Sequence, residues 1–326
     1  MHYFGITLWR TLCYNSRHGH SPQEELVMKK LIMVLMALLV CTAAFAALDF
    51  TEVDALYLTD EHDQEVYDKL TVMLEQATTE EEKANVLWRL SRVCVDLGDA
   101  IDKSDKKARF AIYEEGEQYA LDSIAAYPTA QGYLWKCSNI GRWGQTKGVF
   151  DSLAKAKPMV QDLEVMIDDL GCLDSSEAWY VLAVLYDSLP GKPISFGNSN
   201  AAISYGRIAC DTIPRNVIYG GTYKQLAEML WNRNWNAKKR ASEISKMQKN
   251  WDKETSNIEK YKYYEGANGA QAYPLWTKTA LSSMTDRQEA VVILKYAQAV
   301  FDGRKTHTQA DVDNYNEIAA LLKEWT

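Results

Sequence analysis

The segment that decides the fold reads Trp179-Tyr180-Val181-Leu182-Ala183-Val184-Leu185-Tyr186. Its aromatic, apolar and small residues at the first, fourth, fifth and eighth positions share one face if the segment is a helix. The arrangement recurs in Tyr223-x-x-Leu226-Ala227-x-x-Leu230. Two matching helices predict an internal repeat, in which the small residue lets a neighbouring helix approach closely.

Aromatic residues near the start of successive predicted helices extend the repeat along the chain. They are Trp88, Trp135, Trp179 and Tyr223, at steps of 47, 44 and 44 residues. Two second helices also match, with small and aromatic residues in the same spacing and a proline that ends each helix. Their positions are Gly116, Tyr119, Ser123 and Pro128 in one, and Ala202, Tyr205, Ala209 and Pro214 in the other.

These positions are those of tetratricopeptide repeats, and no stretch shows sustained period-2 alternation, so we predict an all-α fold, an α-solenoid of tetratricopeptide-like helical hairpins. The usual repeat is about 34 residues long, so the longer steps require insertions. Two candidate insertions are Leu189–Asn198 and Gly141–Gly148. A HEAT-type solenoid and an irregular helical bundle are the alternatives, and the HEAT type does not explain the second helices that end in proline.

Local signals mark several helix ends. Thr79–Glu82 and Thr285–Gln288 read as capping boxes that each open a helix. We expect the first helix to stop at Gly98 and the second to end before Gly303. The repeats are assigned to residues 47–265 and capping helices to 266–326, with helices at about 285–302 and 308–324. Residues 266–270 are the expected hinge.

The N-terminal part reads as a targeting segment. Met28-Lys29-Lys30, an apolar run and Ala44-Phe45-Ala46 predict a signal peptide over residues 28–46. Residues 1–27 resemble neither a signal peptide nor a folded domain, so we expect translation to start at Met28; a peptide from residues 11–27 in a mass spectrum would refute this. An uncleaved anchor and lipidation at Cys41 stay open as alternatives. The segment predicts an exported protein of the periplasm or cell envelope.

The net charge and the cysteines of the chain bear on its partners and on its disulfide bonding. The net charge is −8, and removing residues 1–46 makes the remainder more acidic, so we expect no nucleic-acid partner. Four cysteines follow the leader: Cys94, Cys137, Cys172 and Cys210. They are predicted to be buried thiols, with two disulfides as the alternative in an exported chain. The basic stretch Lys238–Lys253 is interpreted as the solvent-exposed side of a helix, or as a patch for an acidic partner.

Three segments carry a family resemblance: Val86–Arg92, the helix Leu153–Leu170, and the Pro190–Gly197 loop followed by Ala202–Pro214. Over about residues 80–235 the chain resembles a group that includes regulators of microtubule dynamics and bacterial exported relatives. It is more distantly similar to the T component of TRAP transporters. Both resemblances imply stacked helical hairpins and binding without catalysis. The chain departs from the repeat pattern at Gly206 and Met166, where we expect distortion.

The usual signatures of catalysis are absent from the sequence after the leader. It has two histidines, His62 and His307, in no metal-ligand spacing, and it has no G-x-S-x-G elbow. Gly141–Gly148 lacks the phosphate-loop spacing and is interpreted as a turn between helices. We expect no catalytic residue, no cofactor and no metal site. An enzyme remains the third hypothesis.

Repeat arrays bind along a groove lined by their first helices. Counting from the aromatic positions, the candidate groove residues are Arg89, Tyr133, Lys136, Trp143, Tyr180, Lys224 and Trp231. Aromatic and basic side chains of this kind anchor a partner, although Trp143 and Trp231 are equally consistent with packing. The leading hypothesis is a non-enzymatic scaffold that binds a protein. The alternative is a transporter-associated component that partners a solute-binding protein or holds a small or hydrophobic ligand.

Overall fold

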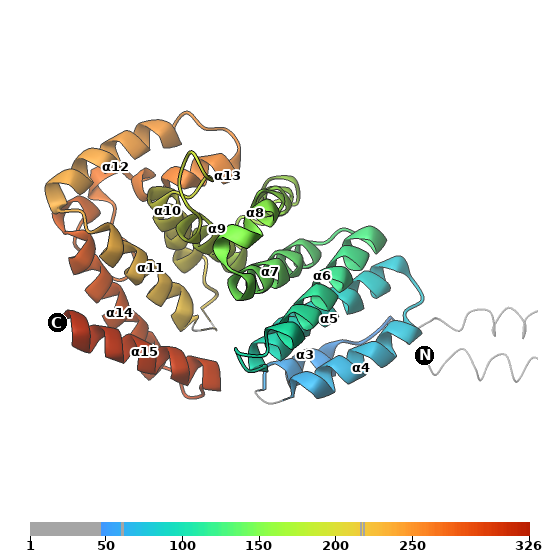
Figure 1. Ribbon diagram of the computed structural model, residues 1–326. Coiled ribbons are helices and arrows are strands. Elements are labelled where there is room, and N and C mark those ends of the chain that lie inside the picture. Colours follow the sequence, from blue (N-terminus) through green and yellow to red (C-terminus); the bar gives the residue numbers. More distant parts are fainter. Residues whose placement is uncertain (1–46, 60–61, 216, 218) are drawn as a thin grey trace, which may run out of the picture. The chain divides into compact units, whose positions relative to one another are not determined.

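The computed structural model describes residues 47–59, 62–215, 217 and 219–326 (Figure 1). The predicted upstream extension at 1–27 and signal peptide at 28–46 lie outside these residues. Every regular element in the described part of the chain is a helix, which confirms the all-α prediction. None of these helices is long and apolar enough to cross a membrane.

The helices follow one another with short connections. The α-helices are α3 (Thr51–Tyr57), α4 (Asp63–Gln76), α5 (Glu80–Ala100), α6 (Lys106–Ala126), α7 (Ala130–Lys147), α8 (Val149–Glu164), α9 (Ser176–Ser188), α10 (Ser199–Asp211), α11 (Gly220–Arg233), α12 (Ala237–Trp251), α13 (Asn257–Lys260), α14 (Asp286–Asp302) and α15 (Gln309–Trp325). A π-helical turn, η2 (Val165–Asp169), extends α8, and 3-10 turns form η3 (Tyr261–Gly266), η4 (Gly269–Gln271) and η5 (Leu281–Ser283).

The predicted capping boxes are confirmed. Thr79 accepts a hydrogen bond from the Glu82 amide at the start of α5, and Thr285 accepts one from the Gln288 amide at the start of α14. In each case the side chain of the third helical residue bonds back to the cap. Each box satisfies backbone donors that a helix start otherwise leaves unpaired.

Consecutive helices pack in pairs through the first part of the chain. Helix α5 packs on α6, α7 on α8 and α9 on α10. The first helices also contact one another in the order α5, α7, α9 and α11 (Figure 1). Small residues let the two helices of a pair approach. Ser123 Oγ donates to the Ala84 carbonyl at 2.9 Å, and Ser176 Oγ donates to the Ala209 carbonyl at 2.8 Å, each joining the end of a second helix to the start of a first.

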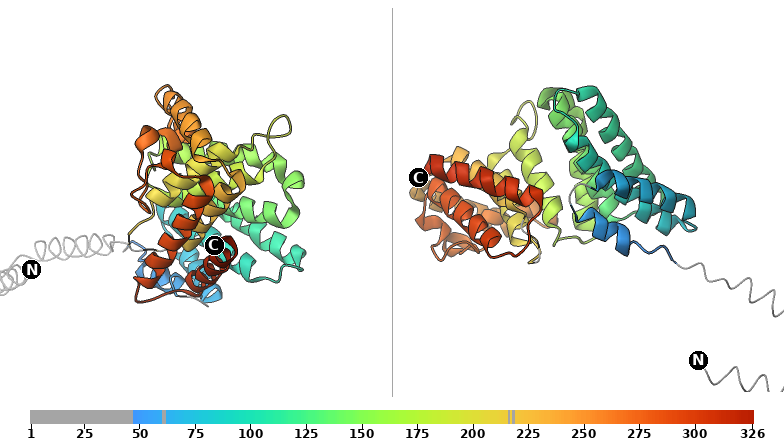
Figure 2. Two further views of the ribbon diagram at one scale, coloured as in Figure 1. Left: turned by 90° about the vertical axis from the view of Figure 1, so that its left-hand side faces the viewer. Right: turned by 90° about the horizontal axis from the view of Figure 1, so that it is seen from below.

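The fourth pair is assembled differently. Helix α11 packs mainly on α14, and α15 contacts both (Figures 1 and 2). The residues between α11 and α14 pack on one another and on α10: α12 contacts η3 and η5, and η3 also covers α10. Helix α14 thus takes the place of the second helix of the α11 pair, and an inserted segment, residues 237–285, separates the two in sequence.

The aromatic positions of the repeat differ in burial. The Trp179 side chain is fully buried, and its ring stacks on Tyr261 at 4.6 Å and on Tyr205 at 5.8 Å. Tyr223 is buried against Tyr296 of α14. Trp88 and Trp135 are half-buried. The main core therefore centres on α9 to α11, with buried residues of α7, α8 and α14 packed around them, and a smaller cluster lies among α3, α4 and α5.

Two glycine-based predictions are wrong. Helix α5 continues through Gly98 to Ala100, because this glycine admits the Tyr113 ring: a Cβ there would lie 2.2 Å from Tyr113 Cε1. Helix α7 also runs through Gly141 and Gly144, so most of the predicted turn is helical. Only Gly148 leaves the helical conformation: its φ is 111°, a value that glycine adopts readily.

The two expected departures from the repeat have different causes. Gly206 lies where α10 meets α11, and a Cβ there would come within 2.9 Å of Met229 Cε. The glycine therefore lets α10, the second helix of one pair, approach α11, the first helix of the next pair. Met166 is buried in η2, where the helix widens into a π-turn.

The segment expected to act as a hinge is a closely packed turn. A Cβ on Gly266 would lie 2.6 Å from the Gln248 backbone nitrogen, and Gly269 has φ of 69°. The capping-helix prediction, 285–302 and 308–324, matches α14 and α15 closely. The domain boundary at 266 remains a prediction.

The four described cysteines are free thiols. Cys94, Cys137 and Cys210 are buried, and Cys172 is partly exposed. The buried-thiol interpretation therefore holds for three of them, and the structure pairs none of the four in a disulfide.

Candidate functional site

Two of the predicted groove cations are paired within the fold. Arg89 donates from Nε to Asp54 Oδ1 at 2.9 Å and from Nη2 to Asp54 Oδ2 at 2.7 Å, joining α5 to α3. Lys136 Nζ lies 2.8 Å from Asp162 Oδ2 of α8. Both cations hold neighbouring helices together, which leaves less of their charge for a partner.

Tyr180 and Lys224 do lie near each other. Burial raises the pKa of the Tyr180 hydroxyl, while the positive charges of Arg142 and Lys224 oppose this and Glu228 adds to it. Lys224 also pairs with Glu317 of α15. The structure thus brings two predicted residues of α9 and α11 to one polar face, where carboxylates already balance the lysine.

The remaining aromatic candidates of α7 are used in packing. Tyr133 is half-buried against the main core. The Trp143 indole donates to Glu114 Oε1 at 3.0 Å and lies 5.5 Å from the Phe110 ring. Lys155 Nζ lies 5.1 Å above the Trp143 ring. Since Phe110 and Glu114 belong to α6 and Lys155 to α8, Trp143 lies between second helices.

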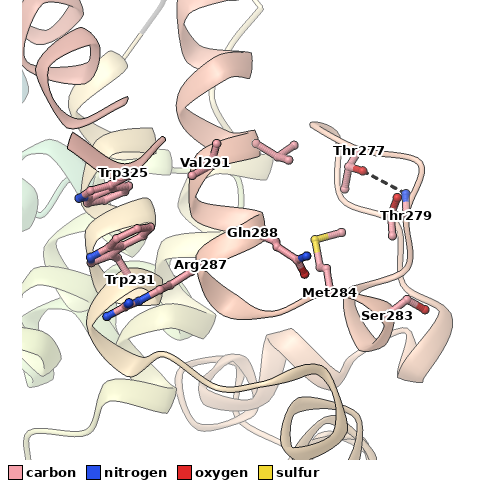
Figure 3. A pocket seen from close by; sticks show the side chains of 10 residues that line it. Trp231, Thr277, Thr279, Ser283, Met284, Arg287, Gln288, Val291 and Trp325 are labelled. Carbon is pink, nitrogen blue, oxygen red and sulfur yellow. Dashed lines mark hydrogen bonds between the residues drawn. The ribbon is translucent and has the colours of Figure 1, made fainter. Parts of the chain in front are cut away.

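Trp231, at the end of α11, is part of a surface that the sequence did not reveal. Its ring stacks on Trp325 of α15, with centroids 4.1 Å apart and planes at 6°. The Arg287 guanidinium lies 4.5 Å from the Trp231 centroid. In Figure 3 the two indoles and the guanidinium form a layered stack. Stacked indoles and a cation over an aromatic face are each favourable by about 0.5–1.5 kcal/mol.

Beside this stack is a depression of about 540 Å³, which we call the Trp231 surface. On the far side from the indoles it is bounded by the segment before α14 (Figure 3). Its lining combines aromatic, aliphatic, hydroxyl and amide groups with one charge. The lining residues are Trp231, Thr277, Thr279, Ser283, Met284, Arg287, Gln288, Val291, Val292 and Trp325.

Helical periodicity of α14 creates this surface. Asp286 and Glu289 point inward and are fully buried, whereas Arg287 and Gln288 are exposed. Val291 follows Arg287 by one turn and lines the same depression. In the first turn of α14, Asp286 and Glu289 therefore face the core, and Arg287 and Gln288 face the solvent.

Arg287 gives the surface its chemical character. It is the one charged residue in the lining, and within the described residues it forms no ion pair. An unpaired guanidinium beside hydroxyl and amide groups suits a carboxylate, which arginine binds through two parallel hydrogen bonds. The indoles and Val291 suit an apolar group next to that carboxylate.

A buried charge network lies behind this surface. Three arginines and three acids from five elements meet in the interior, each side chain at most 3% exposed. They are Arg207, Arg233, Arg240, Glu265, Asp286 and Glu289. The positive and negative charges balance, as burial of ions requires.

The network lowers the pKa of two of its carboxyl groups, Glu265 and Glu289. Burial alone would raise the pKa of Glu289, but Arg207 and Arg240 outweigh it and hold the pKa at about 2. The pKa of Glu265 is likewise held well below its usual value, by Arg233 and Arg207. Trp276 Nε1 donates to Glu289 Oε1 at 3.0 Å, which anchors the segment that borders the Trp231 surface. The network therefore fixes the position of that border.

Arg240 corrects one interpretation of the sequence. Lys238–Lys253 was expected to be a solvent-exposed helix side, yet the Arg240 side chain is 0% exposed and pairs with Glu265 and Glu289. Its place at the fourth residue of α12 turns it toward the core. Lys238 and Lys239 beside it, and Lys246 and Lys249 further along, are exposed as expected.

Fold and surface together define an all-α protein of packed helical pairs that presents an aromatic surface with one unpaired cation. Residues 49–167 match the model of a family described as regulator of microtubule dynamics protein 1-3. The match spans α3 to α8 and confirms that part of the predicted resemblance. No curated protein matches the chain. Arg89, Tyr133, Lys136 and Trp143 lie within the matched part, and the Trp231 surface lies beyond it.

Proposed function

We propose that this protein is a non-enzymatic binding scaffold of the periplasm or cell envelope, and that the Trp231 surface holds a segment of a protein partner. The observation that carries the proposal is Arg287, an exposed cation on a rigid aromatic stack that forms no ion pair in the described residues. Rigid aromatic and arginine groups are the side chains that most often dominate protein interfaces.

The shape of the surface favours a peptide segment. The depression, lined from α11, α14, α15 and the segment before α14, is open to solvent, unlike the enclosed sites that surround small ligands. The chemistry favours a segment in which a carboxylate is next to an aliphatic or aromatic side chain. The match to a family named for regulation supports a binding role without identifying the partner.

Affinity capture tests this proposal. The protein, purified from cells that express the full chain, is used to capture proteins from a native envelope extract, and bound proteins are identified by mass spectrometry. Arg287→Gln removes the cation from an exposed position. Lys295→Gln is the matched control, because Lys295 is exposed on the same helix and lies outside the depression.

The outcomes separate the hypotheses. A partner held by the wild type and by Lys295→Gln, but lost or much reduced with Arg287→Gln, supports the Trp231 surface. A partner that binds all three proteins equally would place the interface elsewhere. Stoichiometric recovery of a solute-binding protein would favour the transporter-associated alternative, and recovery of no specific protein would count against a scaffold.

A further inference from the structure

A second cavity, of about 520 Å³, shares no residue with the Trp231 surface. It lies where the loop between α9 and α10 meets the inserted segment, and we call it the loop pocket. Its lining residues are Tyr186, Lys192, Phe196, Asn198, Asn200, Ala201, Glu243, Lys246, Met247, Asn250, Glu259, Lys262 and Tyr263. Its volume is in the range of sites that hold small molecules.

The loop that forms one wall has a fixed shape. The Gly197 amide donates to the Pro190 carbonyl at 3.0 Å, and the Asn198 amide donates to the Tyr186 carbonyl at 2.9 Å. A Cβ on Gly197 would lie 1.8 Å from the Leu189 carbonyl oxygen, so only glycine fits. The loop therefore closes on itself and holds Phe196 against Tyr186, with ring centroids 5.1 Å apart.

The floor of the pocket is apolar and preformed. Tyr186, Ala201 and Met247 are buried, and Phe196 and Tyr263 are half-buried at its edge. These groups come from α9, the loop, α10, α12 and η3, so the pocket exists only because the inserted segment packs against α10. A ligand with an aromatic or aliphatic body would bury apolar area here.

The lining of the pocket contains more positively than negatively charged side chains. Each glutamate is paired with a lysine three residues later: Glu243 with Lys246 at 2.7 Å, and Glu259 with Lys262. Lys192 forms no ion pair within the described residues, so the lining carries one excess positive charge. In an acidic protein, such a local excess attracts an anion.

We propose that the loop pocket binds a small organic anion, namely a carboxylate or phosphate that carries an aromatic or aliphatic group. The body packs on Phe196 and Tyr263, the two half-buried rings of the lining, and the anionic group lies toward Lys192 at the rim. The side-chain amides of Asn198 and Asn250 supply further polar groups in the lining. This site is independent of the Trp231 surface and of the protein partner proposed for it.

Calorimetric titration with defined probes tests the inference. The protein purified from cells expressing the full chain is titrated with phenyl phosphate and with phenylacetate, and phenylacetamide is the neutral comparison. Lys192→Gln removes the unpaired charge from an exposed loop position. Lys249→Gln is the matched control, since Lys249 is exposed on α12 and lies outside the pocket.

Binding of at least one anionic probe, with phenylacetamide bound more weakly, is the expected result. Lys192→Gln should weaken the anion about threefold, as loss of one partly exposed charge contact does, and Lys249→Gln should leave it unchanged. Equal binding of phenylacetamide, equal binding by Lys192→Gln, or no binding of either anion at millimolar concentration would overturn the inference.

Discussion

Arg233, the last residue of α11, forms a two-point ion pair with Asp286, the first residue of α14. Nε donates to Oδ2 at 2.8 Å and Nη2 donates to Oδ1 at 2.9 Å. The Asp286 carboxylate also accepts from the Trp235 amide at 2.8 Å. This contact joins two helices that the inserted segment separates, and Asp286 directly precedes Arg287 in α14.

Asp286→Asn should strongly destabilise the protein. The substitution leaves Arg233 buried with less compensating charge, and breaking a buried ion pair on one side costs about 3–5 kcal/mol. The free energy of unfolding from denaturant titration measures the effect. Asp302→Asn, at the exposed end of the same helix, is the control and should change little. A loss of less than about 1 kcal/mol for Asp286→Asn would contradict a structural role for the network.

Stability should fall in acid because of Glu289. Its pKa in the folded protein is about 2, below the usual value of 4.5, so its contribution is complete above about pH 5 and is lost as the pH falls toward 2. The measurement is the unfolding free energy at several pH values between 2 and 7. Glu289→Gln should be less stable at pH 7 and show a shallower decline in acid. Parallel curves for the two proteins would refute the assignment.

Asp96→Asn should have the opposite effect. Burial, with Asp63 and Asp99 nearby, raises the pKa of Asp96 to about 6, although the Tyr57 hydroxyl and Arg92 oppose this. Since the folded pKa is raised above the usual value of 3.8, stability is lost as the pH rises from about 4 to about 6, and the loss is complete above about pH 6. The variant should therefore gain about 1–2 kcal/mol at pH 7. The gain should disappear near pH 4, where wild-type Asp96 is protonated in the folded protein. A gain independent of pH would exclude this cause.

Gly116→Ala and Gly141→Ala form a matched pair within helices. A Cβ on Gly116 would lie 2.3 Å from Asn139 Oδ1, whose amide bridges α7 to Ser91 of α5, so overpacking should cost about 1–3 kcal/mol. A Cβ on Gly141 meets only Met159 Cε, at 3.8 Å. That variant should be neutral or up to about 1 kcal/mol more stable, because alanine favours helix. Melting temperatures compare the two. Equal effects would show that the packing at Gly116 adapts.

Thiol labelling should distinguish the cysteines. Burial raises the pKa of all four described thiols, well above the usual value for Cys137 and Cys210 and less for the partly exposed Cys172. A maleimide should therefore modify Cys172 first in the folded protein, and Cys94, Cys137 and Cys210 only after unfolding. Mass spectrometry of peptides reports the sites. Four unreactive cysteines after unfolding without reductant would instead indicate disulfides.

Signals within one helix predicted the local structure well. The capping boxes at Thr79 and Thr285 are complete in sequence, because the cap and its partner lie three residues apart. Glycine was a poorer guide. Gly98 and Gly141 lie inside helices, since a glycine that admits a neighbouring side chain has the same appearance in sequence as one that ends a helix.

Longer-range relationships were not predictable from a single sequence. Acidic residues are common in the first turn of a helix, where they interact favourably with the helix dipole. The sequence therefore gave no sign that Asp286 and Glu289 are buried. Arg240 follows two exposed lysines and shares their charge, although its side chain is in the core. Trp231 was predicted as a groove candidate or a packing residue, and the Trp325 and Arg287 side chains that contact it come from helices that the repeat pattern did not include.

The separation of α11 from α14 has a consequence during synthesis. Pairs such as α5 and α6 can form soon after they leave the ribosome, because their two helices are nearly contiguous. Helix α11 must wait until residue 302 has emerged before α14 can cover Tyr223 and its apolar neighbours. Nascent chains therefore pass through an interval with this helix uncovered, and a truncation before α14 would make the interval permanent, giving a product prone to aggregation and degradation.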